Sequence, residues 1–235
     1  MFSKPLRALN ILLIAAFVTP IFPAFGQSDL IAIDVLIQPD SRMTDEAEKW
    51  NAIMHEQSPE GFELDEEHAP HVTLIQRFII KSDLPKVLAA VDKVKTKTDI
   101  SSLEMTATGF AHMSDGENGL AGLEVEPTEQ LHALQQAVIE AVNVYAQKGG
   151  DESAFVPDKS GLPFSPILFD YVDNFVPLHT GENFHPHVTT GMAPTVWLEE
   201  LERKPFEKFM FGAKGIAVYQ LGNFGTASKR LDGDH

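Results

Sequence analysis

The 235-residue sequence contains no cysteine, and its 18 Lys and Arg residues are outnumbered by 34 Asp and Glu residues. Without thiols the chain has no disulfide framework, no thiolate zinc site and no cysteine nucleophile. Its formal net charge of -16 argues against binding of long or duplex nucleic acid, which is held by basic stripes. Any chemistry must therefore use His, Ser, Thr, carboxylates or amines, and a small anionic substrate bound at one local site is compatible with this charge.

Long hydrophobic runs are also absent, except near the start of the chain. Lys4 and Arg7 precede an apolar run over residues 11–18, and Ala24-Phe25-Gly26 then forms a small-x-small triplet before Gln27. A basic segment, an apolar segment and a small-residue cleavage site are typical of a secretory signal peptide. We predict a signal peptide over residues 1–26 and a mature chain over residues 27–235.

The alternative for this segment is a membrane anchor. Asn10, Pro20 and Pro23 interrupt the apolar run, which is already shorter than the roughly 20 residues that a spanning helix needs. We therefore expect a periplasmic or secreted protein with no membrane attachment after cleavage, folded as one domain and present as a monomer.

Hydrophobic periodicity predicts alternating strands and helices along the mature chain. Strands are expected over residues 30–38, 71–80, 103–111, 120–125, 187–192, 215–221 and 226–231. Helices are expected over residues 43–54, 84–94, 131–145, where Gly149 and Gly150 would stop the helix, and 195–209. The proline-rich segment 151–183 is expected to be a long loop that covers a site. The fold class is α+β, with two pseudo-symmetric lobes whose antiparallel sheets face a central cleft and whose helices lie outside.

One tetrapeptide occurs twice: Pro70-His71-Val72-Thr73 is identical to Pro186-His187-Val188-Thr189. Each copy opens a predicted strand that a helix and a further strand follow, which indicates an internal duplication. Because side chains alternate along a strand, His and Thr of each copy share one face while the Val points into the core.

If the two copies face one cleft, two imidazoles and two hydroxyls converge on a small volume. One imidazole can accept a proton from an attacking oxygen while the other donates a proton to a leaving oxygen. The two hydroxyls can hydrogen-bond the non-bridging oxygens of a phosphoryl group, and this chemistry needs no metal and no cofactor. His71 and His187 are therefore the catalytic candidates, and Thr73 and Thr189 the substrate-binding candidates.

With these two complete His-x-Thr motifs, the sequence resembles the two-histidine (2H) phosphoesterase superfamily, which includes RNA 2′,3′-cyclic phosphodiesterases and 2′-5′ RNA ligases. The resemblance implies a bilobal fold and hydrolysis of a small phosphodiester, most simply a 2′,3′-cyclic phosphate of a nucleotide or RNA end. It carries over only to His71, Thr73, His187 and Thr189.

The sequence departs from the family where a basic residue often follows the second motif. Gly191 and Met192 stand there instead, and Arg77 after the first motif is expected to be a surface or edge residue. Other candidate phosphate-binding residues are Lys159, Lys214 and Arg230. Aromatic residues that could stack on a nucleobase are Tyr171, Phe175, Tyr219 and Phe224.

Two other functions fit parts of the sequence. His185-Pro186-His187, with His68, His71 and His179, suggests a metal-dependent hydrolase as the alternative enzyme. A second alternative is a non-catalytic exported protein that binds a phosphorylated ligand without turning it over. The remaining histidines, His55, His112, His132 and His235, are expected at the surface.

Overall fold

The computed structural model describes residues 29–157 and 161–233, so the predicted signal peptide, Lys159 and His235 lie outside the described residues. The described part contains five α-helices: α1 (Ser41–Gln57), α2 (Leu84–Lys95), α3 (Glu129–Val142), α4 (Pro166–His179) and α5 (Thr195–Glu202). Its eight strands are β1 (Leu30–Pro39), β2 (Val72–Ile80), β3 (Glu104–Asp115), β4 (Asn118–Val125), β5 (Ala146–Gln147), β6 (His187–Pro194), β7 (Phe209–Leu221) and β8 (Ala227–Arg230). All strand pairs are antiparallel, which confirms the α+β class.

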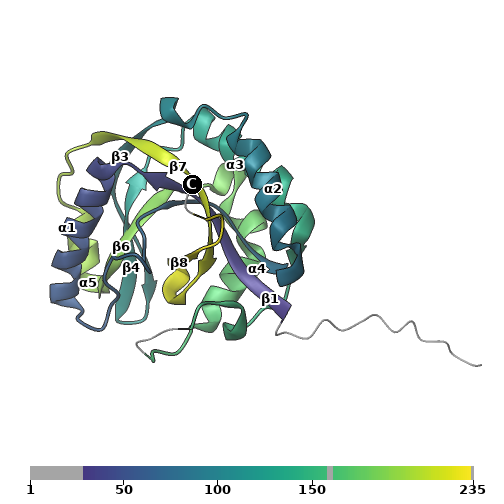
Figure 1. Cartoon of the computed structure of the whole chain (residues 1–235). Helices are drawn as coiled ribbons and strands as arrows, with labels where there is room; N and C mark the ends of the chain where they lie inside the picture. Colours follow the sequence, from purple (N-terminus) through teal and green to yellow (C-terminus); the bar gives the residue numbers. More distant parts are fainter. Residues whose placement is uncertain (1–28, 158–160, 234–235) are drawn as a thin grey trace, which may run out of the picture.

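The sheet has the strand order β5-β2-β1-β7-β3-β4-β6, and β8 pairs with β7. The long strand β7 serves two partners in succession, because residues 209–212 pair with β3 and residues 213–220 pair with β1. It thereby joins a first half of the sheet (β5, β2, β1 and β8) to a second half (β3, β4 and β6). Figure 1 shows β7 between α1 and α5 on one side and α2, α3 and α4 on the other.

Leaving out β5 and β8, the strand pairing is unchanged when β1 is exchanged with β4, β2 with β6, and β3 with β7. The helices follow the same exchange, since α1 connects β1 to β2 but packs on β6, whereas α3 lies between β4 and β6 but packs on β2. The repeated tetrapeptide therefore occupies corresponding places, at the start of β2 and at the start of β6.

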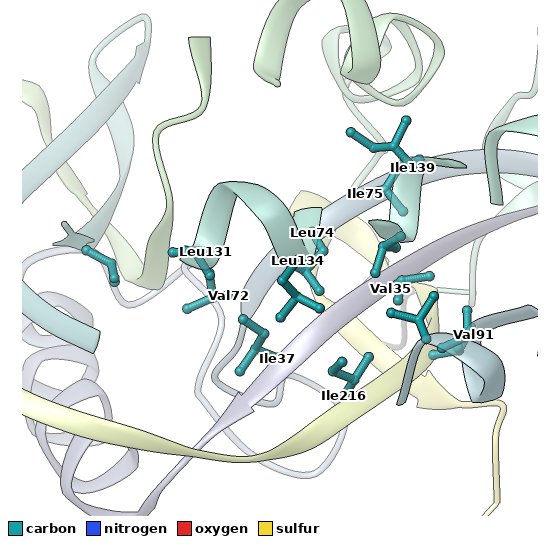
Figure 2. Packing of buried hydrophobic residues seen from close by; sticks show 14 of the residues in the cluster. Val35, Ile37, Val72, Leu74, Ile75, Val91, Leu131, Leu134, Ile139 and Ile216 are labelled. Atoms are coloured by element: carbon teal, nitrogen blue, oxygen red, sulfur yellow. The ribbon is translucent and has the colours of Figure 1, made fainter. Parts of the chain in front are cut away.

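Strand β1 is buried on both faces, as its almost continuous apolar sequence predicts. Val35 and Ile37 on one face pack in the main hydrophobic core with residues of β2, α2 and α3, which Figure 2 shows together. Burying an aliphatic side chain of this size contributes about 1.5–3 kcal/mol, so this cluster fixes the position of β1 beneath the helices. Asp34 is the one charged residue in the strand, and it is completely buried.

Helix α3 begins at an N-cap, where the Thr128 side chain accepts a hydrogen bond from the Leu131 backbone N–H. Its buried stripe contains five apolar residues and one polar residue, Gln135. The helix ends at Val142, so the prediction that it reaches residue 145 and is stopped by Gly149 and Gly150 is wrong. Instead the chain makes a 3-10 turn and then pairs as β5 with β2.

The prediction of a long loop over residues 151–183 is also wrong, because this segment contains helix α4. Ser165 accepts a hydrogen bond from the Ile167 N–H as N-cap, and Pro166 occupies the first turn, where its missing N–H is tolerated. Val172 and Phe175 are buried. The proline that indicated a loop is therefore part of a helix start.

Helix α5 is shorter than predicted, and β7 is longer. The helix ends at Glu202, three residues before Pro205, because proline is disfavoured inside a helix and restricts the residue before it. The sequence predicts residue 209 as the end of this helix and assigns residues 210–212 to no element, but all four residues belong to β7 and pair with β3. Within the described residues, no helix combines the length and the hydropathy that would let it cross a membrane.

Candidate active site

A pocket of about 640 Å³ is lined by residues of both halves of the sheet. Its walls include His71 and Thr73 at the start of β2, and His187 and Thr189 at the start of β6. The structure therefore brings together all four site residues that the sequence predicts. Further wall residues come from β3, β4, α4 and the turn over Asn223–Gly225.

Each motif is followed at once by a β-bulge. In β2, Thr73 pairs with Leu36 and Ile75 pairs with Val35, so Leu74 is the extra residue. In β6, Thr189 pairs with Gly122 and Gly191 with Ala121, so Thr190 is extra. A bulge shifts the alternation of side chains by one residue, and bulges are common beside active sites.

This shift decides which later residues face the pocket. Gln76 and Met192 line the pocket. Without the bulges, strict alternation from His71 and His187 would instead point the residues before and after Gln76 and Met192 into the pocket. Gly191, directly after the second bulge, has a φ of 149°, a conformation that favours glycine. Gly191, which stands where family members often have a basic residue, is thus part of the second bulge.

A side-chain hydrogen bond supports each bulge, from another element in the first case and from the bulge itself in the second. The buried Gln135 of α3 donates from Nε2 to the Leu74 carbonyl at 3.2 Å. The Thr190 hydroxyl, itself the extra residue of the second bulge, donates to the Ala121 carbonyl at 3.2 Å. A buried carbonyl without a donor is destabilising, so these bonds hold the bulges and the residues beside them in place.

The two imidazoles are oriented in the same way. His71 Nδ1 lies 2.7 Å from the Ala69 carbonyl, and His187 Nδ1 lies 2.9 Å from the His185 carbonyl. A carbonyl only accepts, so Nδ1 carries the proton in each ring and Nε2 is the atom available to a ligand. Each Nε2 can therefore accept a proton when the ring is neutral or donate one when it is charged.

A buried carboxylate lies behind the first motif. Asp34 Oδ2 accepts hydrogen bonds from the Thr73 hydroxyl at 2.7 Å and from Gln76 Nε2 at 3.1 Å, and it lies 3.5 Å from His71 Nε2. Because a hydroxyl has a single proton, this bond leaves Thr73 only lone pairs for a ligand. In the described part of the chain, the Thr189 hydroxyl makes no hydrogen bond and its proton is available.

The second half has no counterpart of this carboxylate. Asp34 stands opposite Gln76 in the register of β1 and β2, and the corresponding pair in β4 and β6 is Leu120 and Met192. Both of these apolar side chains line the pocket. The two motifs are identical in sequence but differ in their surroundings.

The pKa values of the two histidines move in opposite directions. Burial lowers the pKa of His71, but the Asp34 carboxylate outweighs this effect and the pKa is raised. For His187, enclosure by the pocket walls lowers the pKa most, the His185 carbonyl raises it, and the charge on His71 lowers it. The Asp34 carboxylate raises the pKa of His187 by less than these effects, and the result is a lowered pKa. His187 is exposed to solvent.

Arg77 is not the surface residue that was predicted. It is buried, and its guanidinium donates to Asn143 Oδ1 at 2.9 Å and to the Val172 carbonyl at 3.2 Å. The bulge at Leu74 turns it away from the face of His71, so Arg77 connects β2 to the segments around α3 and α4. It takes no part in the pocket.

The other candidate residues divide into pocket and core. Tyr171 and Phe224 line the pocket, whereas Phe175 and Tyr219 are buried in the core. Burial raises the pKa of Tyr171 to about 12, so its hydroxyl stays neutral. Phe224 has a φ of 59°, a strained conformation for this residue that fixes its ring at the pocket wall.

The basic candidates do not reach the pocket. Lys214 is exposed elsewhere, and Arg230 Nε pairs with Asp232 at 2.9 Å. Among the described residues that line the pocket there is no lysine or arginine. The surface prediction is wrong for His112, whose side chain is only 13% exposed, lines the pocket and lies 2.6 Å from Glu202.

The histidine cluster that suggested a metal site does not assemble as one. Within residues 29–157 and 161–233, no three His, Asp or Glu side chains are grouped so that they could hold a metal ion. His185 lines the pocket, and its backbone carbonyl accepts the hydrogen bond from His187 Nδ1. His68 pairs with Asp65 and His179 packs on Tyr171.

The fold and this pocket, with a His-x-Thr motif from each half, define a protein of the two-histidine phosphoesterase class. The family model described as the 2'-5' RNA ligase superfamily matches residues 44–209. The chain belongs to this superfamily.

Among solved structures, the chain is similar to Usb1 of Kluyveromyces marxianus, with 10% identity, a TM-score of 0.38, and coverage of 87% of this chain and 99% of that one. A structure of the same protein with uridine monophosphate gives 11% identity, a TM-score of 0.35, and coverage of 74% and 76%. No curated protein matches the chain.

Sequence reasoning missed Asp34 and Gln76. Asp34 could have been found, because it is the single charged residue in an otherwise apolar strand, and such a residue needs a buried partner. Gln76 could not, because its place on the pocket wall depends on the bulge.

Proposed function

We propose that this chain is an exported, metal-independent phosphodiesterase that hydrolyses a small phosphodiester, preferably a 2′,3′-cyclic phosphate of a nucleotide or RNA end. The observation that carries the proposal is the pair of imidazoles in one pocket, each with Nδ1 held by a carbonyl and Nε2 available. Acid and base groups on two sides of one ester are the minimal requirement for metal-free phosphoryl transfer to water.

In the proposed reaction, one histidine takes a proton from water as the water oxygen attacks phosphorus. The other histidine gives a proton to the leaving oxygen as the P–O bond breaks, and the product of a cyclic ester is a phosphomonoester. Thr189 donates a hydrogen bond to a non-bridging oxygen, where negative charge develops. Thr73 can donate a hydrogen bond to the substrate only if its hydroxyl stops donating to Asp34.

The pocket supports a small substrate that carries little charge. Its volume of about 640 Å³ is in the usual range of small-molecule sites. Leu120, Met192 and Phe224 give it apolar walls that can contact a sugar or stack on a base. The acidic chain gives no support to binding of long RNA, and we propose a monomer that acts in the periplasm or outside the cell.

The test is turnover of 2′,3′-cyclic nucleotides, linear dinucleotides and cyclic oligonucleotides by the purified mature chain, with and without EDTA. We expect ring opening at a rate that EDTA leaves unchanged and that His187→Ala lowers by about 10² to 10⁴. The control is His55→Ala, which removes a histidine that contacts Glu63 and does not line the pocket.

Three results would contradict the proposal. Loss of activity with EDTA that zinc or manganese restores would favour the metal-dependent hydrolase. Binding of a cyclic nucleotide without turnover would favour a binding protein. Turnover by His187→Ala at close to the wild-type rate would place the chemistry elsewhere.

A further inference from the structure

Asp34 is the feature of the pocket that the two-histidine chemistry does not explain. Its carboxylate is fully buried, and Oδ2 lies within 3.5 Å of three side chains in or beside the first motif: Thr73, Gln76 and His71. Its other oxygen, Oδ1, has no hydrogen-bond partner in the described part of the chain. A carboxylate in such a place is destabilising unless it interacts with a positive group.

Of the three described groups around Asp34 Oδ2, only the His71 ring can become positive, because Thr73 and Gln76 are neutral. His71 Nε2 lies 3.5 Å from Oδ2, close enough for strong attraction between an imidazolium and a carboxylate, yet too long for a good hydrogen bond. Asp34 therefore favours a proton on Nε2 by its charge without taking that proton up in a full hydrogen bond, which leaves the proton available to a ligand in the pocket.

In the second half, the position that corresponds to Asp34 holds Leu120, an apolar residue that has no charge to interact with His187. A symmetric pair of histidines could work in either direction, but this pair is not symmetric. An imidazolium beside an imidazolium is unfavourable, so a proton that stays on His71 also keeps His187 neutral.

We propose that Asp34 is a positioning residue that makes the two histidines unequal, so that His71 donates the proton to the leaving oxygen and His187 accepts the proton from water. The inference rests on the proposed hydrolysis. After one turnover His71 is neutral and His187 is charged, and exchange of one proton with solvent restores the starting state.

The pH dependence also involves the other titratable groups around the two rings. These are Asp34 on β1, Glu124 on β4, Tyr171 and His179 on α4, His185 before β6, and His68 before β2. Asp34 is the buried carboxylate among them, and Glu124 is exposed opposite His187 in the register. Glu124 therefore provides a matched control in which one negative charge is removed from the other half of the pocket.

The test compares Asp34→Asn with Glu124→Gln and wild type, by the pH profile of kcat/KM and by NMR titration of the assigned His71 and His187 rings. In wild type, His71 should lose its proton at a higher pH than His187. In Asp34→Asn the basic limb of the profile and the His71 titration should both move to lower pH. We expect kcat/KM at pH 8 to fall by about tenfold or more, with a much smaller loss at pH 5.5.

Glu124→Gln should leave the basic limb in its wild-type place. If it moves that limb as far as Asp34→Asn does, or if Asp34→Asn lowers kcat/KM equally at every pH, the inference is wrong. If Asp34→Asn does not fold, the order of the two titrations in wild type still decides, and His187 titrating above His71 would overturn the proposal. These titrations need no substrate, so absence of turnover in wild type would refute the proposed function without deciding the role of Asp34.

Discussion

Replacement of Gln135 by leucine tests whether the first bulge is held by helix α3. The Gln135 side chain is almost completely buried, and its Nε2 donates to the Leu74 carbonyl at 3.2 Å. Leucine has a similar volume but no donor, so the substitution leaves this carbonyl without that hydrogen bond. The cost of a buried acceptor left in this way is about 1–3 kcal/mol.

The control is Gln136→Leu, one residue further along the same helix. Gln136 is exposed, and its Nε2 donates to Glu140 four residues later at 3.1 Å. A surface pair of this kind contributes only about 0.2–0.5 kcal/mol. Both variants change the same amino acid in the same helix, so helix propensity and the composition of the chain change equally.

Urea unfolding measures the difference in free energy, and a thermal melt measures it independently. For a chain of this size, 1 kcal/mol corresponds to a Tm decrease of about 2–4 °C, so Gln135→Leu should melt roughly 2–12 °C lower. It should also lower kcat by as much as about 10², because Thr73 and Gln76 flank the released bulge. Equal stability of the two variants within about 0.5 kcal/mol would refute the support that we assign to Gln135.

Three further predictions concern the site. His71→Ala and His187→Ala should each lower kcat by about 10² to 10⁴, and the double variant should be little worse than the worse single one, whereas additive losses would indicate two separate sites. Gly122→Ala places a Cβ 2.8 Å from the Val188 carbonyl, so it should displace β6 and destabilise the fold by about 1–3 kcal/mol, measured in a thermal melt. Gly215→Ala is the control, because its Cβ would lie 3.9 Å from the nearest atom and should not destabilise the fold. The profile of kcat/KM against pH should be bell-shaped. Activity appears as pH rises through the lowered pKa of His187 and disappears as pH rises through the raised pKa of His71. The His187 variant should therefore lose the acidic limb, and the His71 variant the basic limb.

The parts of the fold that follow from local pattern could be predicted from the sequence. The continuous apolar run of β1 predicts burial on both faces, and the duplicated tetrapeptide predicts two strands that present His and Thr to one place. Both are seen in the structure. These features depend on residues close in the chain, where side-chain periodicity is a direct signal.

The parts that failed depend on contacts between distant segments. The bulge at Leu74 is fixed by Gln135, 61 residues away, and no pattern around residue 74 signals it. For this reason the burial of Arg77 and the place of Gln76 were not predictable. Helix α4 was missed because proline at a helix start looks like proline in a loop when the N-cap is not recognised.

The shared strand β7 has a consequence for synthesis of the chain. Until residues 209–221 leave the ribosome, β1 lacks the neighbour on its second edge and β3 has only β4 beside it. Two open edges of this kind readily pair with other chains, so the emerging polypeptide is exposed to aggregation until residues 209–221 appear. Neither half can mature ahead of the other, and truncation before Phe209 should yield insoluble material rather than a smaller folded unit.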